Sequence, residues 1–235
     1  MQKFVAITLF AVAAAGCAAP SDADTRVVIL NNVPPSEGCG VEASEDSHIS
    51  SGVLDVRSER GYLLTPVLKN FSSSEGGTLE DQRLFFAEGA DISLRFLRLT
   101  QFDTAFSVII NASVSPDGGL SATRFELMSP ALMSDLRAAI DPGSINDDTM
   151  IATVQVYGEQ GGSELITRPF DYPVRLCNGC ADLNLGPCLG LPEGFMGASR
   201  GGECSPYQDA YVQCCTTSTG FYQCPAEPED PPAAR

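Results

Sequence analysis

The placement of nine cysteines constrains the fold of this 235-residue chain more than any other sequence feature. One lies near the start, at Cys17, and a second is Cys39. The other seven are clustered toward the end of the chain: Cys177, Cys180, Cys188, Cys204, Cys214, Cys215 and Cys224. In an exported protein, the even set of eight that excludes Cys17 predicts four disulfides. Because seven is odd, full pairing requires one tail cysteine to bond Cys39, and the remaining connectivity stays open.

The first residues predict an export signal. Lys3 supplies a positive charge, and Phe4 to Ala15 is an uncharged, mostly apolar run. Such a run is too short to cross a bilayer as a helix, which needs about 20 residues. The segment Ala14-Ala15-Gly16-Cys17 resembles the lipobox of bacterial lipoproteins. The alternative is an ordinary secretory signal, cut after Ala15 or Ala19.

The lipobox resemblance implies how the mature chain begins. Residues 1–16 would be removed as the signal peptide, Cys17 would be acylated, and residues 17–24 would tether the lipid to the folded domain. Two or three acyl chains give firm attachment, since each buried methylene contributes about 0.8 kcal/mol. Ala18 stands where lipoproteins retained in the inner membrane usually carry aspartate. The resemblance therefore implies the outer membrane and leaves open which face of it.

The chain is strongly acidic. It carries 14 Lys and Arg against 30 Asp and Glu, a formal net charge of −16. Nucleic-acid binding requires basic patches that release counterions, so no nucleic-acid partner is expected. The same balance argues against adsorption to anionic headgroups and is typical of a protein kept soluble by its charge.

Residues 25–176 predict a β-sandwich domain. In 92–96, apolar and polar residues alternate with the period of two that is typical of a strand. One short helix is expected after Ser129, which can cap it, and before Asp141-Pro142-Gly143, which stops it. The Asp-Gly in 115–119 predicts a hairpin. Turn-separated strands without a repeated strand-helix pattern predict a mainly β fold, an antiparallel Ig-like β-sandwich. The expected strands are 26–30, 52–56, 62–68, 92–96, 106–114, 123–127, 150–157 and 165–176.

Residues 177–224 predict a small appendage held by disulfides, because they are rich in Gly, Pro and Cys and have little periodicity. Residues 225–235 predict a disordered tail. The aromatic residues of the appendage are Phe195, Tyr207, Tyr211, Phe221 and Tyr222. We expect them to fill a core that so small a unit otherwise lacks. If they are exposed instead, they indicate a binding surface.

Several of these features together resemble a group of envelope lipoproteins from Gram-negative bacteria. They are the lipobox, the early loop cysteine Cys39, the strand 51–56 (Ser-Gly-Val-Leu-Asp-Val), Asn70 at the end of the next strand, and a tail with Cys-x-x-Cys in 177–180 followed by Cys-x-x-x-Gln-Asp-x-x-x-x-Cys in 204–214. Tyr207 stands where that group would carry glycine. The resemblance implies an outer-membrane address and an Ig-like architecture, and it implies no catalytic residues.

The tail also has two possible chemistries. Cys177-x-x-Cys180 follows a strand, as in thiol-redox sites, but Gly179 and the Pro- and Gly-rich sequence after it predict no helix to activate a thiolate. A zinc ribbon needs two close cysteine pairs, and the adjacent Cys214 and Cys215 suit one metal poorly. We expect structural disulfides, with Cys214 and Cys215 bonded in two different directions.

Other candidate sites are weaker. His48 is the single histidine, so any histidine-based catalyst must use it, and it lies in a polar loop without a nucleophile motif. The acidic run 141–148 has oxygen ligands that suit calcium, but it does not match an EF-hand loop. A polar loop after a helix explains that run equally well.

The sequence thus predicts a protein that is not an enzyme and needs no cofactor. We expect a lipoprotein attached to the outer membrane through Cys17, with a structural or binding role toward an envelope protein or a glycan. The alternative is an exported thiol-redox or metal-binding protein that uses the tail from Cys177 to Cys224.

Overall fold

The computed structural model describes residues 26–35, 37–73, 83–140, 145–191, 201–202 and 204–226. The expected signal peptide, the Cys17 tether and the expected disordered tail lie outside these ranges, apart from Pro225 and Ala226. The described chain is mainly β, as predicted, with one α-helix and a small sheet at its C-terminal end. No helix in these ranges is long and apolar enough to cross a membrane.

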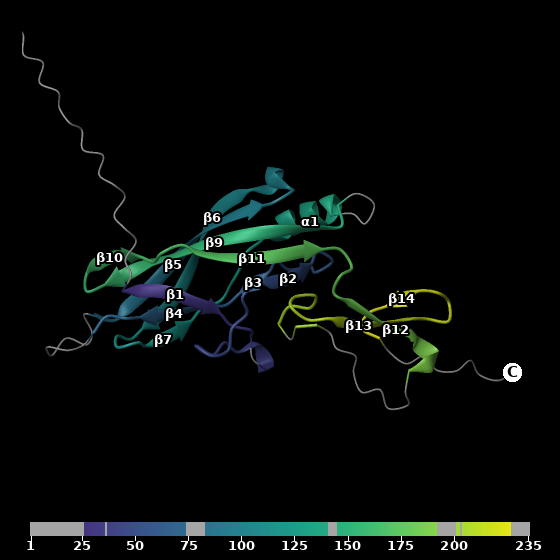
Figure 1. The fold of residues 1–235 in the computed structure, drawn as a ribbon, viewed down its shortest axis with the longest axis horizontal. Helices are drawn as coiled ribbons and strands as arrows, with labels where there is room; N and C mark the ends of the chain where they lie inside the picture. Colours follow the sequence, from purple (N-terminus) through teal and green to yellow (C-terminus); the bar gives the residue numbers. More distant parts are fainter. Residues whose placement is uncertain are drawn as a thin grey trace, which may run out of the picture.

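The largest sheet has six strands (Figure 1). Its order is β2, β11, β9, β5, β6, and β10 also pairs with β9. The pairs are antiparallel except β11 with β2, which is parallel, a departure from the all-antiparallel prediction. The bounds are Gly52–Asp55 (β2), Phe85–Phe96 (β5), Thr104–Val114 (β6), Asp147–Gln160 (β9), Ser163–Ile166 (β10) and Phe170–Cys177 (β11).

A second sheet packs against the first. It has the order β1 (Val27–Asn32), β4 (Pro66–Asn70), β7 (Leu120–Ala122). A two-stranded piece, β3 (Leu63–Leu64) with β8 (Phe125–Glu126), lies beside it. Every second residue along most of β9 is buried, which is the pattern of a strand with one face in the core. Buried residues from both sheets form one apolar cluster, so the domain is a β-sandwich.

The expected hairpin at 115–119 is not formed. The turn exists, with Asp117 and Gly118 in the left-handed region at φ 59° and 82°, but β7 pairs with β4 in the second sheet and leaves β6 paired with β5. The turn therefore carries the chain from one sheet to the other. An Asp-Gly pair fixes the backbone of a tight turn and does not fix which strands pair across it.

The predicted helix is present as α1 (Pro130–Ala139). Ser129 caps it, since its hydroxyl accepts a hydrogen bond from the Leu132 amide at 3.2 Å, and Pro130 occupies the first turn. Met133 and Leu136 are buried against the core. Arg137 in the last turn donates to the carbonyls of Val56 and Ser58, which ties the helix to the chain after β2.

The appendage is a small three-stranded sheet of order β12 (Asp182–Pro187), β13 (Val212–Thr216), β14 (Tyr222–Gln223). It follows β11 directly. In Figure 1 it lies at one end of the long axis, while β1 begins toward the other end. Among the described residues, short 3-10 helices are η1 (Glu37–Cys39), η3 (Thr100–Phe102) and η4 (Cys188–Gly190).

Candidate functional site: the junction of appendage and sandwich

All eight cysteines other than Cys17 are paired. The four disulfides are Cys39–Cys204, Cys177–Cys180, Cys188–Cys215 and Cys214–Cys224. The long-range bond that the odd count predicts is Cys39–Cys204, which joins positions 165 residues apart. Cys214 and Cys215 bond in different directions, as expected. The disulfides therefore tie the appendage both to itself and to the first loop of the sandwich.

Residues 204–211, here called the capping segment, lie along the free side of β2. The Asp55 amide donates to the Tyr207 carbonyl at 3.0 Å, and the Asp209 amide donates to the Val53 carbonyl at 2.9 Å. Leu54 and Gln208 form an isolated antiparallel bridge. The capping segment thus acts as a short added strand that covers one edge of the main sheet.

Gln208 fastens the capping segment to the neighbouring β3. Its side chain is buried and binds both backbone groups of Leu63: the Leu63 amide donates to Oε1 at 2.8 Å, and Nε2 donates to the Leu63 carbonyl at 2.9 Å. An amide side chain used in this way replaces the backbone partner that an edge strand lacks.

A second cluster joins Asp209 to two buried tyrosines. The Tyr62 hydroxyl donates to Asp209 Oδ2 at 2.6 Å and lies 2.9 Å from the Tyr172 hydroxyl. Burial raises the pKa of Tyr62 far above its usual range, and it raises the pKa of Tyr172 to about 12. Part of Asp209 is exposed, yet burial of its carboxyl against these rings raises its pKa. The tyrosines therefore stay neutral donors, and the cluster positions the capping segment.

Arg57 bridges the sandwich and the appendage. Its guanidinium donates at 2.6 Å to Asp55 in β2 and at 2.6 Å to both oxygens of Asp182 in β12. Burial alone would raise the pKa of Asp55, but hydrogen bonds from Arg57 and from the backbone of Ala181 outweigh it and lower that pKa. The Asp55 hydrogen bond raises the pKa of Arg57. Paired charges that share several hydrogen bonds give the junction a fixed geometry.

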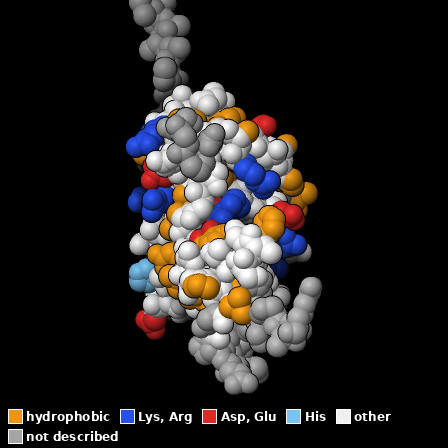
Figure 2. All heavy atoms as spheres, turned by 90° about the vertical axis from the view of Figure 1, so that its right-hand side faces the viewer, with side chains coloured by type: hydrophobic (Ala, Val, Ile, Leu, Met, Phe, Trp, Pro, Cys, Tyr) orange, Lys and Arg blue, Asp and Glu red, His pale blue; other side chains and the backbone are white. Residues whose placement is uncertain are grey.

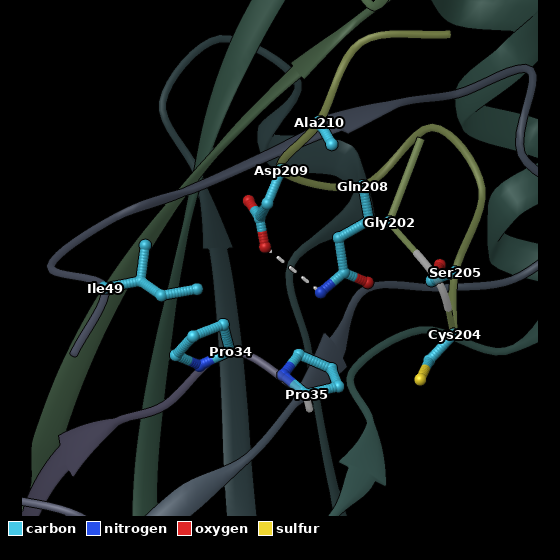
Figure 3. A pocket seen from close by; sticks show the side chains of 9 residues that line it. All are labelled: Pro34, Pro35, Ile49, Gly202, Cys204, Ser205, Gln208, Asp209 and Ala210. Carbon is cyan, nitrogen blue, oxygen red and sulfur yellow. Dashed lines mark hydrogen bonds between the residues drawn. The ribbon is translucent and has the colours of Figure 1, made fainter. Parts of the chain in front are cut away.

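A cavity of about 160 Å³ lies between the capping segment and the first loops of the sandwich (Figure 3). Pro34, Pro35 and Ile49 form its apolar side, and Gln208 and Asp209 lie across from them. Ser205 also lines it, and its buried hydroxyl has no hydrogen-bond partner among the described residues. A catalytic serine needs a base within hydrogen-bond reach. The described residues give Ser205 no such base.

The appendage carries exposed apolar side chains. Five exposed large hydrophobic side chains belong to it: Leu183, Leu189, Tyr211, Phe221 and Tyr222. Phe221 is 73% exposed. Large apolar side chains that are exposed as a group often mark a surface that binds another molecule. Figure 2 views the molecule from the appendage end and shows hydrophobic side chains on this face. We call this group of five residues the appendage surface.

The expectation that the tail aromatics fill a core is wrong for three of them, since Tyr211, Phe221 and Tyr222 are exposed. The core of the appendage consists of Cys188, Cys215 and Ala226, with Leu185 and Leu191 packed against it. A disulfide thus takes the place of large side chains. Tyr207 is half-buried, and the Arg57 guanidinium lies 5.2 Å from the centre of its ring. Phe195 lies outside the described residues.

Two clusters have metal-ligand types at short distance: Asp55 with Cys177 and Cys180, and Asp182 with Cys214 and Cys224. In both, the sulfurs form disulfides and the carboxylate already binds Arg57. The segment after Cys180 enters β12, so it offers no helix N-terminus to the Cys177–Cys180 pair. Metal binding by these sulfurs would first require reduction of a disulfide.

Among the described residues, the other sequence candidates are not assembled into a site. His48 is exposed in a loop before Ile49. Of the calcium candidate 141–148, residues 141–144 lie outside the described part. Asp148 accepts hydrogen bonds from the amides of Leu99 and Thr149 at 2.9 and 2.7 Å, and Asp147 pairs with Arg98 and Arg175. These two carboxylates therefore bind backbone amides and arginines of the main sheet and of the loop after β5.

Comparison with known proteins identifies no family. No protein-family profile matches the chain, and no curated protein matches it. A crystal structure of a protein from Archaeoglobus fulgidus is similar over 55% of this chain and 94% of its own, with 10% identity and a TM-score of 0.35. A likeness this distant carries no argument about function.

The sequence did not predict the capping segment, because nothing in its pattern is typical of a strand.

Proposed function

We propose that the protein is a non-enzymatic lipoprotein of the outer membrane that binds an envelope protein or a glycan through the appendage surface. The observation that carries the proposal is this surface itself, where five exposed hydrophobic side chains sit on a unit held by disulfides. A rigid apolar surface loses little conformational freedom on binding, and exposed aromatic residues are typical binding anchors.

The proposed anchor is compatible with this surface. Cys17 would carry the lipid, and β1 begins at Val27, ten residues later. Since β1 starts toward the end of the long axis away from the appendage (Figure 1), attachment to a membrane would leave the appendage surface uncovered. The acidic charge of the chain agrees with a partner other than nucleic acid.

The anchor is tested by the intact mass of the protein purified from membranes, with thiol alkylation under non-reducing conditions. We expect a mature chain that starts at Cys17, carries two or three acyl chains and has no alkylated thiol. Unmodified chain cut after Ala15 or Ala19 would contradict the anchor. Alkylated thiols would favour the thiol-redox or metal-binding alternative.

The binding role is tested by photocross-linking in cells. A photoreactive phenylalanine replaces Phe221 in one variant and Phe71 in the control, because Phe71 is also more than half exposed and lies at the end of the second sheet. We expect one discrete adduct from position 221 and none from position 71. No adduct at 221, or equal adducts from both positions, would contradict a binding role of the appendage surface.

A further inference from the structure

The edge of the main sheet formed by β6 is open. In the ranges that the structure covers, β6 pairs only with β5, and no backbone hydrogen bond reaches its outer side. This strand is eleven residues long, Thr104–Val114, and its sequence has no charged residue and no proline. Figure 1 shows it at the border of the main sheet. Natural sheets usually protect such an edge with charges, prolines or a covering segment.

Several side chains of β6 are apolar and are not fully buried. Ile109 is 92% exposed, the highest exposure of any large hydrophobic residue described. Phe106 and Val108 face the core side and are only partly buried, because no strand lies beyond them. The edge thus has unpaired backbone groups together with uncovered apolar side chains.

The register of the sheet limits the part of β6 that another strand can join. The pairing of β5 with β6 is irregular between the pairs Ala87–Ala112 and Gly89–Ile109. A bulge of this kind bends the edge and interrupts regular pairing. Thr104 to Ile109 is therefore the regular stretch, and it is long enough for a short strand pairing.

We propose that β6 binds β6 of a second copy of this chain, antiparallel, within the stretch Thr104 to Ile109. Two identical strands meet across a two-fold axis, so the edge must be compatible with itself. An uncharged strand satisfies this condition, since it brings no like charges together. A pairing centred on Ser107 places the large Ile109 beside the small Ala105 of the other copy, on the same face of the joined sheet.

The carboxylate of Asp91, one strand away from the edge, does not oppose this pairing. Asp91 in β5 accepts a hydrogen bond from the Ser107 hydroxyl at 2.6 Å, so each copy has a carboxylate one strand away from the joined edge. The two Asp91 residues would then be separated by three strand spacings, about 14 Å. That distance exceeds the Debye length of about 8 Å at physiological ionic strength, so salt screens most of their repulsion.

The proposed dimer would carry two copies of the appendage surface. Antiparallel strands place the two appendages at opposite ends, so the dimer would present two appendage surfaces. Two surfaces on one particle raise the apparent affinity for a repetitive partner. The pairing does not depend on the proposed binding role, because it uses no residue of the appendage.

The test is sedimentation equilibrium of the full chain with Cys17→Ala, which cannot be acylated, from about 1 µM to 1 mM, where complexes of modest affinity dissociate and form. We expect the average mass to rise from one chain to two. Ile109→Lys is expected to stay at one chain throughout. Phe221→Lys is the matched control, since it adds the same charge at another exposed apolar position, and we expect it to dimerise as the parent does.

Two further measurements keep the inference falsifiable. Ala105→Lys, also at an exposed position, is expected to reduce dimerisation even if Ile109→Lys folds poorly. Hydrogen exchange is expected to slow with protein concentration only in residues 104–109. A parent that stays monomeric at all concentrations, an Ile109→Lys variant that dimerises normally, or a loss of the dimer in Phe221→Lys would overturn the proposal.

Discussion

The two edges of the main sheet differ: the β2 edge is covered by another segment of the chain, and the β6 edge is not covered by any described residue. At β2, the capping segment supplies backbone partners, Gln208 binds β3, and the Cys39–Cys204 disulfide holds the segment in place. At β6, the part of the chain that the structure describes supplies no partner, and Ile109 is almost fully exposed. Covering an edge requires many ordered residues and a long chain excursion. The β2 edge is thus closed within one chain, whereas the β6 edge is open among the described residues, where we propose contact with a second copy.

The largest effect is expected from removal of the Cys39–Cys204 disulfide as the double variant Cys39→Ser, Cys204→Ser. In the chain-entropy model, a loop of 165 residues gives a stabilisation of up to about 5 kcal/mol. For a domain of this size that corresponds to a decrease in Tm of about 10–20 °C. Thermal unfolding followed by circular dichroism measures it.

The matched control is Cys177→Ser with Cys180→Ser, because that disulfide closes a loop of only 3 residues. The same model gives it about 1.5 kcal/mol. Equal losses of Tm in the two double variants would contradict the role of the long-range disulfide in holding the capping segment. A Cys39→Ser single variant should expose one thiol of the tail to alkylation.

A moderate effect is expected from Gln208→Ala. The change leaves the partly buried amide and carbonyl of Leu63 without these partners, which costs up to about 1–3 kcal/mol. Gln155→Ala is the control, since Gln155 is half-buried and makes a single hydrogen bond, to the Thr167 carbonyl at 3.1 Å. Urea denaturation should give a clearly larger loss for Gln208→Ala. A larger loss for the control would show that the capping segment is weakly held.

Opposite pH dependences are expected from two carboxylates at the closed edge. The pKa of Asp55 is lowered in the folded state, so its stabilisation is present above its unfolded pKa of about 3.9 and is lost as the pH falls through the folded pKa. The pKa of Asp209 is raised, so its contribution is present below about 3.9 and is lost as the pH rises through the folded pKa.

The measurement compares Asp55→Asn and Asp209→Asn with the parent between about pH 3 and pH 8, the range that brackets carboxylate titration. The deficit in Tm of Asp55→Asn should shrink toward acid. The Tm of Asp209→Asn relative to the parent should rise with pH, by a small amount because Asp209 is partly exposed. Parallel profiles for the two variants would contradict the opposite environments of these side chains.

The smallest effect on stability is expected at the open edge. Ile109→Lys replaces an exposed side chain, so the free energy of unfolding of the monomer should change by less than about 0.5 kcal/mol. Chemical denaturation at low protein concentration measures it. A loss of several kcal/mol would mean that Ile109 packs within its own chain.

Much of the fold was predictable because it depends on the alternation of apolar and polar residues along strands and on whether the number of cysteines in the tail is odd or even. The alternation in 92–96 predicts the inner face of β5, and the odd number of tail cysteines predicts the bond to Cys39. The failed hairpin at 115–119 has another cause. Burial decides which sheet a strand joins, and a turn sequence holds no information about the distant β4 that captures β7.

The capping segment escaped prediction because side chains and backbone strain define it. Tyr207 and Asp209 have φ values of 70° and 55°, in the left-handed region that costs a non-glycine residue about 1–2 kcal/mol. The glycine expected at position 207 from the lipoprotein resemblance would adopt this conformation freely. Here a tyrosine adopts it, and its ring lies beside the Arg57 guanidinium, which offsets part of the strain.

The exposed aromatic residues of the appendage show a second limit of prediction. Sequence composition indicates that a small unit needs a core, but it does not say that a disulfide between Cys188 and Cys215 supplies most of it. Once the sulfurs occupy the centre, Phe221 and Tyr222 are left outside. Cysteine connectivity decides this outcome, and the sequence leaves it among many possibilities.

Amide hydrogen exchange, measured residue by residue at low protein concentration, tests the contrast between the two edges most directly. We predict slow exchange at Asp55, whose amide binds the capping segment, and at Val53, whose amide donates to the Asp209 carboxylate at 2.7 Å. In β6, the alternate amides that face away from β5 should exchange rapidly. Equal protection of the outward amides at both edges would contradict a closed β2 edge and an open β6 edge.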